Sequence, residues 1–236
     1  MKTVILTIIK NEHRYLDEWI RYHCELGFDT LFILEDRGSE SHKHITDKYP
    51  NVILRSASEF TNTKQARIFN EVYNNVIKQE YDWCLLLDTD EFVTCDIPFN
   101  IILEKHKNDP YIWLQWHNYG ASGIINKNVY RKPIWETYTK RCGNMNVDEV
   151  FEKTGKMMYN CKKHDDTLYI HRFPNAPKQE DIYIRHYITK SWSEWKWKIE
   201  ERGMHNPRHR KLENFFIYNP EMKDTILNKN ISTNET

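Results

Sequence analysis

Two aspartates, Asp88 and Asp90, stand one residue apart directly after the apolar run 84–87. A short run of this kind is typical of a buried strand, which would hold both carboxylates at its carboxyl end. Because two like charges repel each other there, a cation is their expected partner. Mg²⁺ and Mn²⁺ take oxygen ligands and commonly share one or two carboxylates with substrate phosphates. We therefore predict that Asp88 and Asp90 bind Mn²⁺ or Mg²⁺, with a ligand's diphosphate completing the shell. A solvated acidic turn is the alternative.

The elements that must position this pair follow an alternating pattern of short apolar runs and helical periodicity, which is the signature of βα units. In open α/β sheets ligands bind at the carboxyl ends of the strands. The sequence predicts an α/β fold of one domain, with a central, mostly parallel sheet flanked by helices. We expect strands at 3–9, 30–35, 52–55 and 83–87, and helices at 15–26 and 64–78.

The second half of the chain is less regular. A strand is expected at 111–116, and the stretch from there to about residue 184 is interpreted as an irregular, mixed region. Ser191 and Glu194 form an S-x-x-E capping box, which predicts a helix that closes near Gly203. We divide the chain into a first half (1–110), a second region of the same domain with the C-terminal helix (111–227) and a flexible tail (228–236).

The 236 residues carry 34 basic and 34 acidic side chains, a balance that favours neither nucleic acid nor a strongly acidic partner. Five irregularly spaced cysteines argue against a disulfide framework or a zinc site. No apolar run has the length of a signal peptide or a transmembrane helix, so a cytoplasmic location is expected. The basic cluster 208–211, followed by aromatic residues at 215–218, would suit a peripheral membrane contact. A helix end that caps the domain explains it as well.

Several further motifs occur in a fixed order along residues 3–205. They are Lys10-Asn11-Glu12, the helix 15–26 with Gly27, the segment 88–92, Trp116 with Gly120, Ser122 and Gly123, and the stretch from 185 to 203 with Thr189-Lys190-Ser191 and Glu194-Trp195. In this order and composition the chain resembles glycosyltransferases of the GT-A fold, specifically relatives of families 2 and 92.

The resemblance implies that residues 1–110 form a nucleotide-sugar-binding half and residues 111–227 an acceptor-side region. In the donor site that it implies, the loop Lys10, Asn11 and Glu12, together with Asp36, approaches the base and the ribose. The family's second strand commonly ends in Asp-Asn before a serine, whereas this chain has Asp36-Arg37-Gly38-Ser39. Many relatives complete the metal shell with a late histidine, which here would be His186, with His171 as the rival.

Two groups of charged side chains are assigned to the leaving phosphates and to proton transfer. Lys190, at the N-terminus of the capped helix, is expected to meet the diphosphate. The family implies inversion by a single displacement, which needs a carboxylate base. Asp148 and Glu149 are the candidates, although Asp-Glu pairs in polar loops are usually only solvated. Glu91 is instead expected to orient the metal ligands.

The predicted function is transfer of a sugar from a nucleotide-sugar, a UDP-hexose by family analogy, to a glycan or glycolipid acceptor in polysaccharide or lipopolysaccharide biosynthesis. Two alternatives stay open. One is a nucleotidyltransferase, although its usual N-terminal Gly-rich loop has no counterpart in residues 3–14. The other is a nucleotide-sugar-binding protein without catalysis.

Overall fold

The computed structural model describes residues 1–126, 132–142, 154–165, 167–170, 179–202 and 211–232. The chain divides into two compact units. The sheet unit comprises Met1–Trp116 and Lys153–Arg185, and the second unit comprises His117–Glu152 and His186–Thr236. Each is described by itself.

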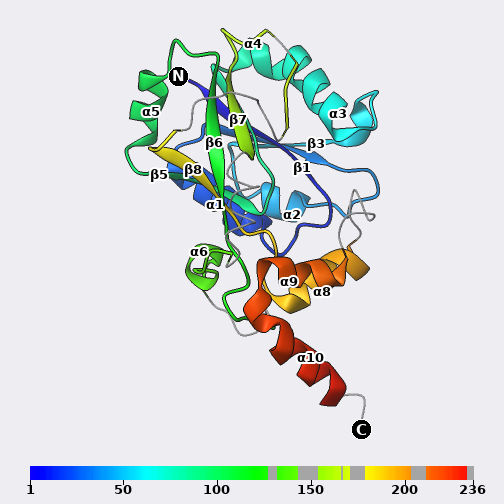
Figure 1. The fold of residues 1–236 in the computed structure, drawn as a ribbon. Coiled ribbons are helices and arrows are strands. Elements are labelled where there is room, and N and C mark those ends of the chain that lie inside the picture. The colour runs from blue at the N-terminus through cyan, green and yellow to red at the C-terminus, as the bar shows by residue number, and fades with distance from the viewer. Residues whose placement is uncertain (127–131, 143–153, 166, 171–178, 203–210, 233–236) are drawn as a thin grey trace. The chain divides into compact units, whose positions relative to one another are not determined.

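The described residues form an eight-stranded sheet in the order β3-β2-β1-β4-β7-β6-β8-β5 (Figure 1). The strands are β1 (Thr3–Ile9), β2 (Thr30–Glu35), β3 (Val52–Ser56), β4 (Trp83–Leu86), β5 (Glu91–Cys95), β6 (Tyr111–Asn118), β7 (Gly155–Asn160) and β8 (Ile182–His186). Strands β3, β2, β1 and β4 are mutually parallel, whereas β7 pairs antiparallel with both β4 and β6. The predicted α/β class is therefore confirmed, with parallel pairing in the part of the sheet that carries the first strands of the chain.

The described helices connect these strands and continue beyond them. They are α1 (Leu16–Leu26), α2 (Lys43–Thr46), α3 (Gln65–Val72), α4 (Lys78–Glu80), α5 (Phe99–Lys105), α6 (Ile134–Thr137), α8 (Trp192–Glu200), α9 (Phe215–Tyr218) and α10 (Lys223–Ser232). A π-helical turn, Tyr73–Ile77, joins α3 to α4, so the predicted helix 64–78 is helical but not uniformly α-helical. Gly27 ends α1 at φ 110°, the left-handed conformation that its position predicted.

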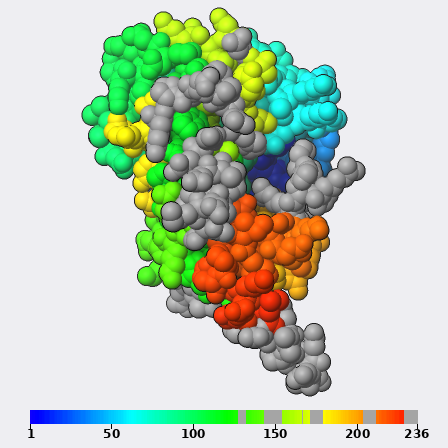
Figure 2. All heavy atoms as spheres, viewed as in Figure 1, coloured from blue at the N-terminus to red at the C-terminus, as the bar shows by residue number. Residues whose placement is uncertain are grey.

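Both faces of β1, β2 and β4 are buried, whereas β3 at the end of the sheet is partly exposed. On one face, side chains such as Leu6, Phe32 and Leu86 pack with Phe69 and Tyr73 of the α3 segment. Alternate residues of the same strands, which point to the opposite face, have no exposed surface either, as Ile5, Ile33 and Leu85 show. Strands buried on both faces explain the continuous apolar runs in the sequence. On the face drawn in Figure 2, the cyan segment with α3 forms part of the surface, and little of the dark-blue N-terminal strand is visible.

The region interpreted as irregular, from 117 to about 184, contains a central strand of the sheet. Strand β7 lies between β4 and β6, and all six of its residues are buried. Its sequence, Gly-Lys-Met-Met-Tyr-Asn, mixes polar with apolar residues, so it lacks the apolar run that marks β1 and β4. The position of β7 in the sheet therefore depends on partners that its polar side chains find elsewhere in the chain, such as Asp88 for Lys156, and not on a local sequence pattern. Strand β5 and helix α5 were also not predicted.

The second unit has its own apolar core and several buried polar contacts. The buried core residues are Ala121, Trp195, Phe215, Met222 and Ile226. Ser191 Oγ accepts a hydrogen bond from Glu194 N–H, and the Glu194 carboxylate accepts one from Ser191 N–H, which confirms the predicted capping box. The Tyr138 hydroxyl donates to Glu194 Oε2 over 2.6 Å. Helix α10 runs to Ser232, past the start of the predicted tail at 228. None of the described helices has the length and hydropathy needed to span a bilayer.

Candidate active site

Asp88 follows β4, at the edge of the sheet where β1 and β2 also end. The parallel register pairs Leu6 with Leu86, and Leu87 N–H donates to the Leu6 carbonyl over 3.3 Å. The Asp88 carbonyl then accepts the N–H of Glu91 at 3.1 Å, which closes a tight turn around Thr89 and Asp90. The predicted placement of the Asp88–Asp90 pair at the carboxyl end of a buried strand is therefore what the structure shows.

Helix α1 holds the chain immediately after this turn through three hydrogen bonds to the backbone of β5. Trp19 Nε1–H donates to the Glu91 carbonyl at 2.9 Å, and the Tyr22 hydroxyl donates to the Val93 carbonyl at 2.8 Å. His23 Nε2 accepts the N–H of Val93 at 3.3 Å, while its Nδ1–H donates to the Trp19 carbonyl at 2.8 Å. These contacts explain why the motif at 88–92 and the aromatic pattern of helix 15–26 occur together.

Both ring nitrogens of His23 are thus used by neutral hydrogen bonds in a place without solvent. The side chain is fully buried, and burial lowers its pKa to about 3. His23 therefore stays uncharged in the folded protein at neutral pH, and it serves as a fixed link between α1 and β5.

Sequence reasoning missed a buried lysine that contacts the acidic turn. Lys156 of β7 places Nζ 2.7 Å from Asp88 Oδ2 and 3.6 Å from Glu91 Oε2. Burial alone would lower the pKa of Lys156, but the charges of Asp88 and Glu91 outweigh it, so the net shift of this pKa is upward. Lys156 lies in a segment of mixed polar and apolar residues, so no local signal in the sequence indicated that it would be buried.

The carboxyl group of Glu91 lies near both Lys156 and the backbone of Asp88. Its Oε2 accepts the N–H of Asp88 at 2.9 Å, which supports the predicted orienting role. Its side chain is fully buried, and burial, reinforced by Asp88 and Asp90, raises its pKa well above the usual range despite the nearby Lys156. Its second oxygen, Oε1, has no hydrogen-bond partner within the described ranges.

The predicted donor-binding segments come together at the ends of β1 and β2. Asn11, with φ 52°, donates from its N–H to Ser39 Oγ at 3.1 Å, and its Oδ1 accepts the N–H of Glu40 at 2.9 Å. Asp36 N–H donates to the Ile9 carbonyl at 2.8 Å. A non-glycine residue in the left-handed region is strained, and such residues gather at functional sites. The Lys10–Glu12 loop and the turn at Asp36 are therefore neighbours, as the sequence indicated.

Two stacked histidines that were not predicted, His13 and His42, lie beside this loop. His42 Nε2 accepts the N–H of Glu12 at 2.9 Å, and His42 Nδ1 faces Glu35 Oε1 at 3.1 Å. The ring of His13 stacks on His42 with centroids 4.0 Å apart. Burial lowers the pKa of His42, although Glu35 opposes the shift.

Other predicted site residues belong to the second unit. His186 is buried, and its Nδ1 lies 2.9 Å from Asn118 Oδ1, so this nitrogen donates and the ring has a fixed orientation. Lys190, directly before the capped helix, adopts φ 56°. The roles of His186 in metal binding and of Lys190 in diphosphate binding stay predictions. His171, Asp148 and Glu149 lie outside the described residues, as does most of the basic cluster 208–211.

The chemistry of the Asp88–Asp90 turn fits a hard cation. Both side chains offer carboxylate oxygens, the ligand type that Mg²⁺ and Mn²⁺ take together with phosphate oxygens. Among the described residues, no group of three or more His, Cys, Asp or Glu side chains is arranged to hold a metal ion by itself. Of the three predicted ligands, Asp88 and Asp90 lie in the sheet unit and His186 belongs to the second unit, and their binding of a metal ion stays a prediction.

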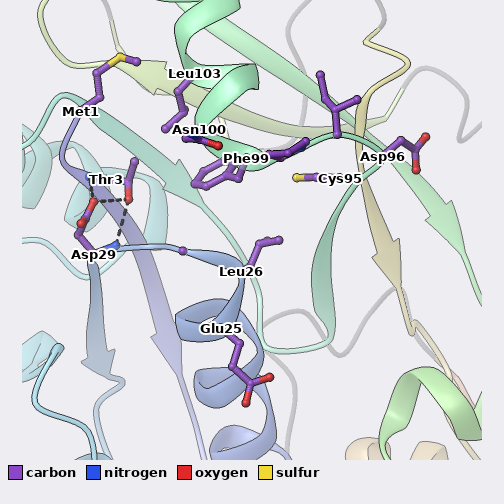
Figure 3. Close-up of a pocket in the computed structure, with 13 residues that line it drawn as sticks. Met1, Thr3, Glu25, Leu26, Asp29, Cys95, Asp96, Phe99, Asn100 and Leu103 are labelled. Atoms are coloured by element: carbon purple, nitrogen blue, oxygen red, sulfur yellow. Dashed lines mark hydrogen bonds between the residues drawn. The ribbon is translucent and has the colours of Figure 1, made fainter.

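A separate cavity of about 700 Å³ opens at the opposite edge of the sheet unit, near the amino ends of β1 and β2 (Figure 3). Asp29, on its wall, accepts hydrogen bonds from the Thr3 N–H and hydroxyl, both at 2.8 Å. Cys95 and Phe99 line the same cavity. None of its lining residues is a predicted site residue, so this cavity is not part of the candidate active site.

Comparison with known proteins gives one clear sequence relative. No protein-family model matches the chain. A glycosyltransferase family 92 protein from Ricinus communis is 22% identical over 213 residues, covering 84% of this chain and 37% of that protein. The chain thus spans a little over a third of the length of this curated relative.

Two solved structures show weaker similarity. HddC from Yersinia pseudotuberculosis aligns with a TM-score of 0.40 and 8% identity over 79% of this chain and 90% of that one. The mannosyltransferase Ktr4p from S. cerevisiae aligns with a TM-score of 0.33 and 14% identity over 48% and 39% of the two chains. The match to the Ricinus communis protein confirms the resemblance to family 92 glycosyltransferases that the ordered motifs indicated.

Proposed function

We propose that this chain is a metal-dependent glycosyltransferase that binds a nucleotide-sugar at the Asp88–Asp90 turn and transfers its sugar to a glycan or glycolipid acceptor. The observation that carries the proposal is the position of the turn. Its two aspartates follow a buried parallel strand, at the sheet edge where β1 and β2 also end and the predicted donor-binding loops begin. The sequence similarity to a family 92 glycosyltransferase supports the same class of reaction.

A Mn²⁺ or Mg²⁺ ion bound there would stabilise the negative charge that develops on the leaving diphosphate. The protein's contribution is a turn that is already in place. Helix α1 holds β5 through Trp19, Tyr22 and His23, and Glu91 accepts the backbone N–H of Asp88. Groups fixed before substrate arrives need no reorganisation during the reaction, which is why such preorganisation accelerates charge-forming steps.

The donor's nucleoside is assigned to the neighbouring loops. Asn11 and Asp36 lie on the segments that follow β1 and β2, and Glu12 is held by His42. A UDP-hexose donor and inversion of the anomeric centre are proposed by analogy with the family. Asp148 or Glu149 would supply the carboxylate base that an inverting transfer requires. A cytoplasmic location, with a peripheral membrane contact through 208–211, is part of the proposal.

Release of nucleoside diphosphate from UDP-, GDP- and ADP-sugars, with Mn²⁺ and with chelator, tests the proposal in the absence of an acceptor. We expect slow, Mn²⁺-dependent hydrolysis of one donor, and a loss of about 100-fold or more in Asp90→Ala, the range seen when charge-stabilising groups are removed. Asp47→Ala is the matched control, because it removes an aspartate from an exposed ion pair with Lys43.

The alternatives are tested in parallel reactions with other substrates, and each gives a different product. Pyrophosphate formation from a nucleoside triphosphate and a sugar phosphate would show a nucleotidyltransferase. Donor binding without any release of nucleoside diphosphate, even after addition of candidate glycan acceptors, would show a binding protein. Either result would overturn the proposed glycosyl transfer.

A further inference from the structure

A lysine in the middle of a sheet is the least expected side chain of the sheet unit. Lys156 is 1% exposed, yet Asp88, its closest ion-pair partner, keeps 34% of its side-chain surface exposed. An ammonium group is costly to bury unless opposite charges and hydrogen bonds compensate it. Because Asp88 is accessible from solvent while its Oδ2 is fixed from inside, the lysine restrains a carboxylate that a ligand can still reach.

The backbone around Lys156 is closely constrained. The antiparallel register pairs Met158 with Leu85, which carries Lys156 past the end of β4 to the level of the acidic turn. A Cβ atom on the preceding residue, Gly155, would lie 2.1 Å from the Leu114 carbonyl oxygen of β6. Glycine is therefore required where β7 approaches β6, and the close approach fixes the strand that delivers the lysine.

Two further groups define where the ammonium lies. The Trp116 ring centroid is 5.8 Å from Lys156 Nζ, within the range of a cation–π contact. Glu91 Oε2 is 3.6 Å from the same nitrogen. Of the two aspartates in the turn, Asp88 is the one whose Oδ2 this ammonium contacts.

We propose that Lys156 is a positioning residue for the candidate cation site, which holds Asp88 Oδ2 and so sets the orientation in which Asp88 meets the metal ion. An ionised carboxylate has about four lone-pair sites, so an ammonium and a cation can share it. The inference rests on the cation site of the proposed function. Groups that orient metal ligands in this way typically change metal affinity about 10- to 100-fold when they are removed.

The competing role is purely structural, in which Lys156 only compensates the buried charge of Glu91. Lys156→Met alone does not separate the two roles, because it leaves Glu91 buried without its partner and the variant can fail to fold. The double variant Lys156→Met/Glu91→Gln removes both charges. The glutamine carbonyl can still accept the Asp88 N–H, so the turn keeps that hydrogen bond. The matched reference is Glu91→Gln alone, in which Lys156 still holds Asp88.

The test is the affinity of the full chain for Mn²⁺ alone, measured by electron paramagnetic resonance of the free ion. We expect binding by the wild type and by Glu91→Gln, and an affinity in the double variant that is about 10- to 100-fold below that of Glu91→Gln. Thermal unfolding and circular dichroism establish that each variant is folded. If the double variant does not fold, Lys156→Gln/Glu91→Gln replaces it, with the same loss expected because a neutral amide holds the Asp88 carboxylate less strongly than an ammonium does.

Equal Mn²⁺ affinity in the double variant and in Glu91→Gln would overturn the positioning role, and so would tighter binding, which would make Lys156 a competing cation. Equal affinity in the replacement Lys156→Gln/Glu91→Gln variant and in Glu91→Gln would overturn it as well. A wild type that does not bind Mn²⁺ would overturn both this inference and the cation site. A wild type that binds Mn²⁺ but no nucleotide-sugar would overturn the proposed function alone, because the role of Lys156 is measured without a nucleotide.

Discussion

The buried histidine that links α1 to β5 should make the protein sensitive to acid in a specific window. His23 is uncharged in the folded state down to a pKa of about 3, against an ordinary value of 6.5 in an unfolded chain. Between these values the unfolded state binds one proton that the folded state does not. Stability from this residue is therefore complete above pH 6.5 and is lost as the pH falls toward 3.

The size of the effect follows from the linkage relation. Well inside the window each pH unit costs about 1.4 kcal/mol, and at pH 6.5 about half of the unfolded molecules already carry the proton. The imidazole of His23 should therefore remove about 2 kcal/mol of stability between pH 6.5 and pH 4.5. His23→Gln has no group that titrates there. The difference in unfolding free energy between the wild type and this variant should accordingly shrink by about that amount at the lower pH.

Urea unfolding at pH 6.5 and pH 4.5 measures this difference while other titrating groups cancel between the two proteins. Tyr22→Phe is the matched control, because it removes the adjacent hydrogen bond from α1 to the Val93 carbonyl without removing a group that titrates in acid. This control should lose the same stability as the wild type on acidification. If His23→Gln also loses as much as the wild type, the assignment of His23 as a buried neutral link is refuted.

Two further variants test the packing that surrounds the candidate site and the second unit. Gly155→Ala should lower the free energy of unfolding, measured in urea, by about 2–3 kcal/mol, because the new Cβ would lie 2.1 Å from the Leu114 carbonyl oxygen. An unchanged urea midpoint would show that β6 and β7 can separate without cost. Tyr138→Phe removes the hydroxyl that donates to the buried Glu194 carboxylate, and thermal unfolding should show that the free energy of unfolding falls by about 1–2 kcal/mol. An unchanged free energy would mean that this hydrogen bond does not stabilise the protein.

The elements that the sequence predicted well are those whose local pattern and tertiary environment agree. Strand β1 is buried on both faces and reads as a continuous apolar run, and its predicted bounds, 3–9, are the observed ones. Helix α1 is amphipathic and ends at a glycine with positive φ, so its buried face and its C-terminal end could both be predicted from the sequence. The Asp88–Asp90 turn follows from the same logic, because a buried strand determines where its carboxyl end lies.

The elements that were missed depend on contacts between residues far apart in the sequence. Strand β7 carries Lys156, whose burial makes sense only beside Asp88, 68 residues earlier. Strand β5 is held by side chains of α1, about 70 residues away, rather than by a local signal. His42 is similar, since its role in fixing Glu12 depends on the pairing of β1 with β2. Periodicity and turn chemistry carry no information about such partners.

We propose above all that a divalent cation joins Asp88 and Asp90 to a nucleotide-sugar. A panel of thermal-shift measurements tests this binding most directly. UDP-, GDP-, CMP- and ADP-sugars are added with and without Mn²⁺ to the wild type, to Asp90→Ala and to the control Asp47→Ala. We predict that one nucleotide-sugar stabilises the wild type and the control only when Mn²⁺ is present, and that Asp90→Ala shows no such shift. Stabilisation that is equal without metal, or that persists in Asp90→Ala, would contradict the account.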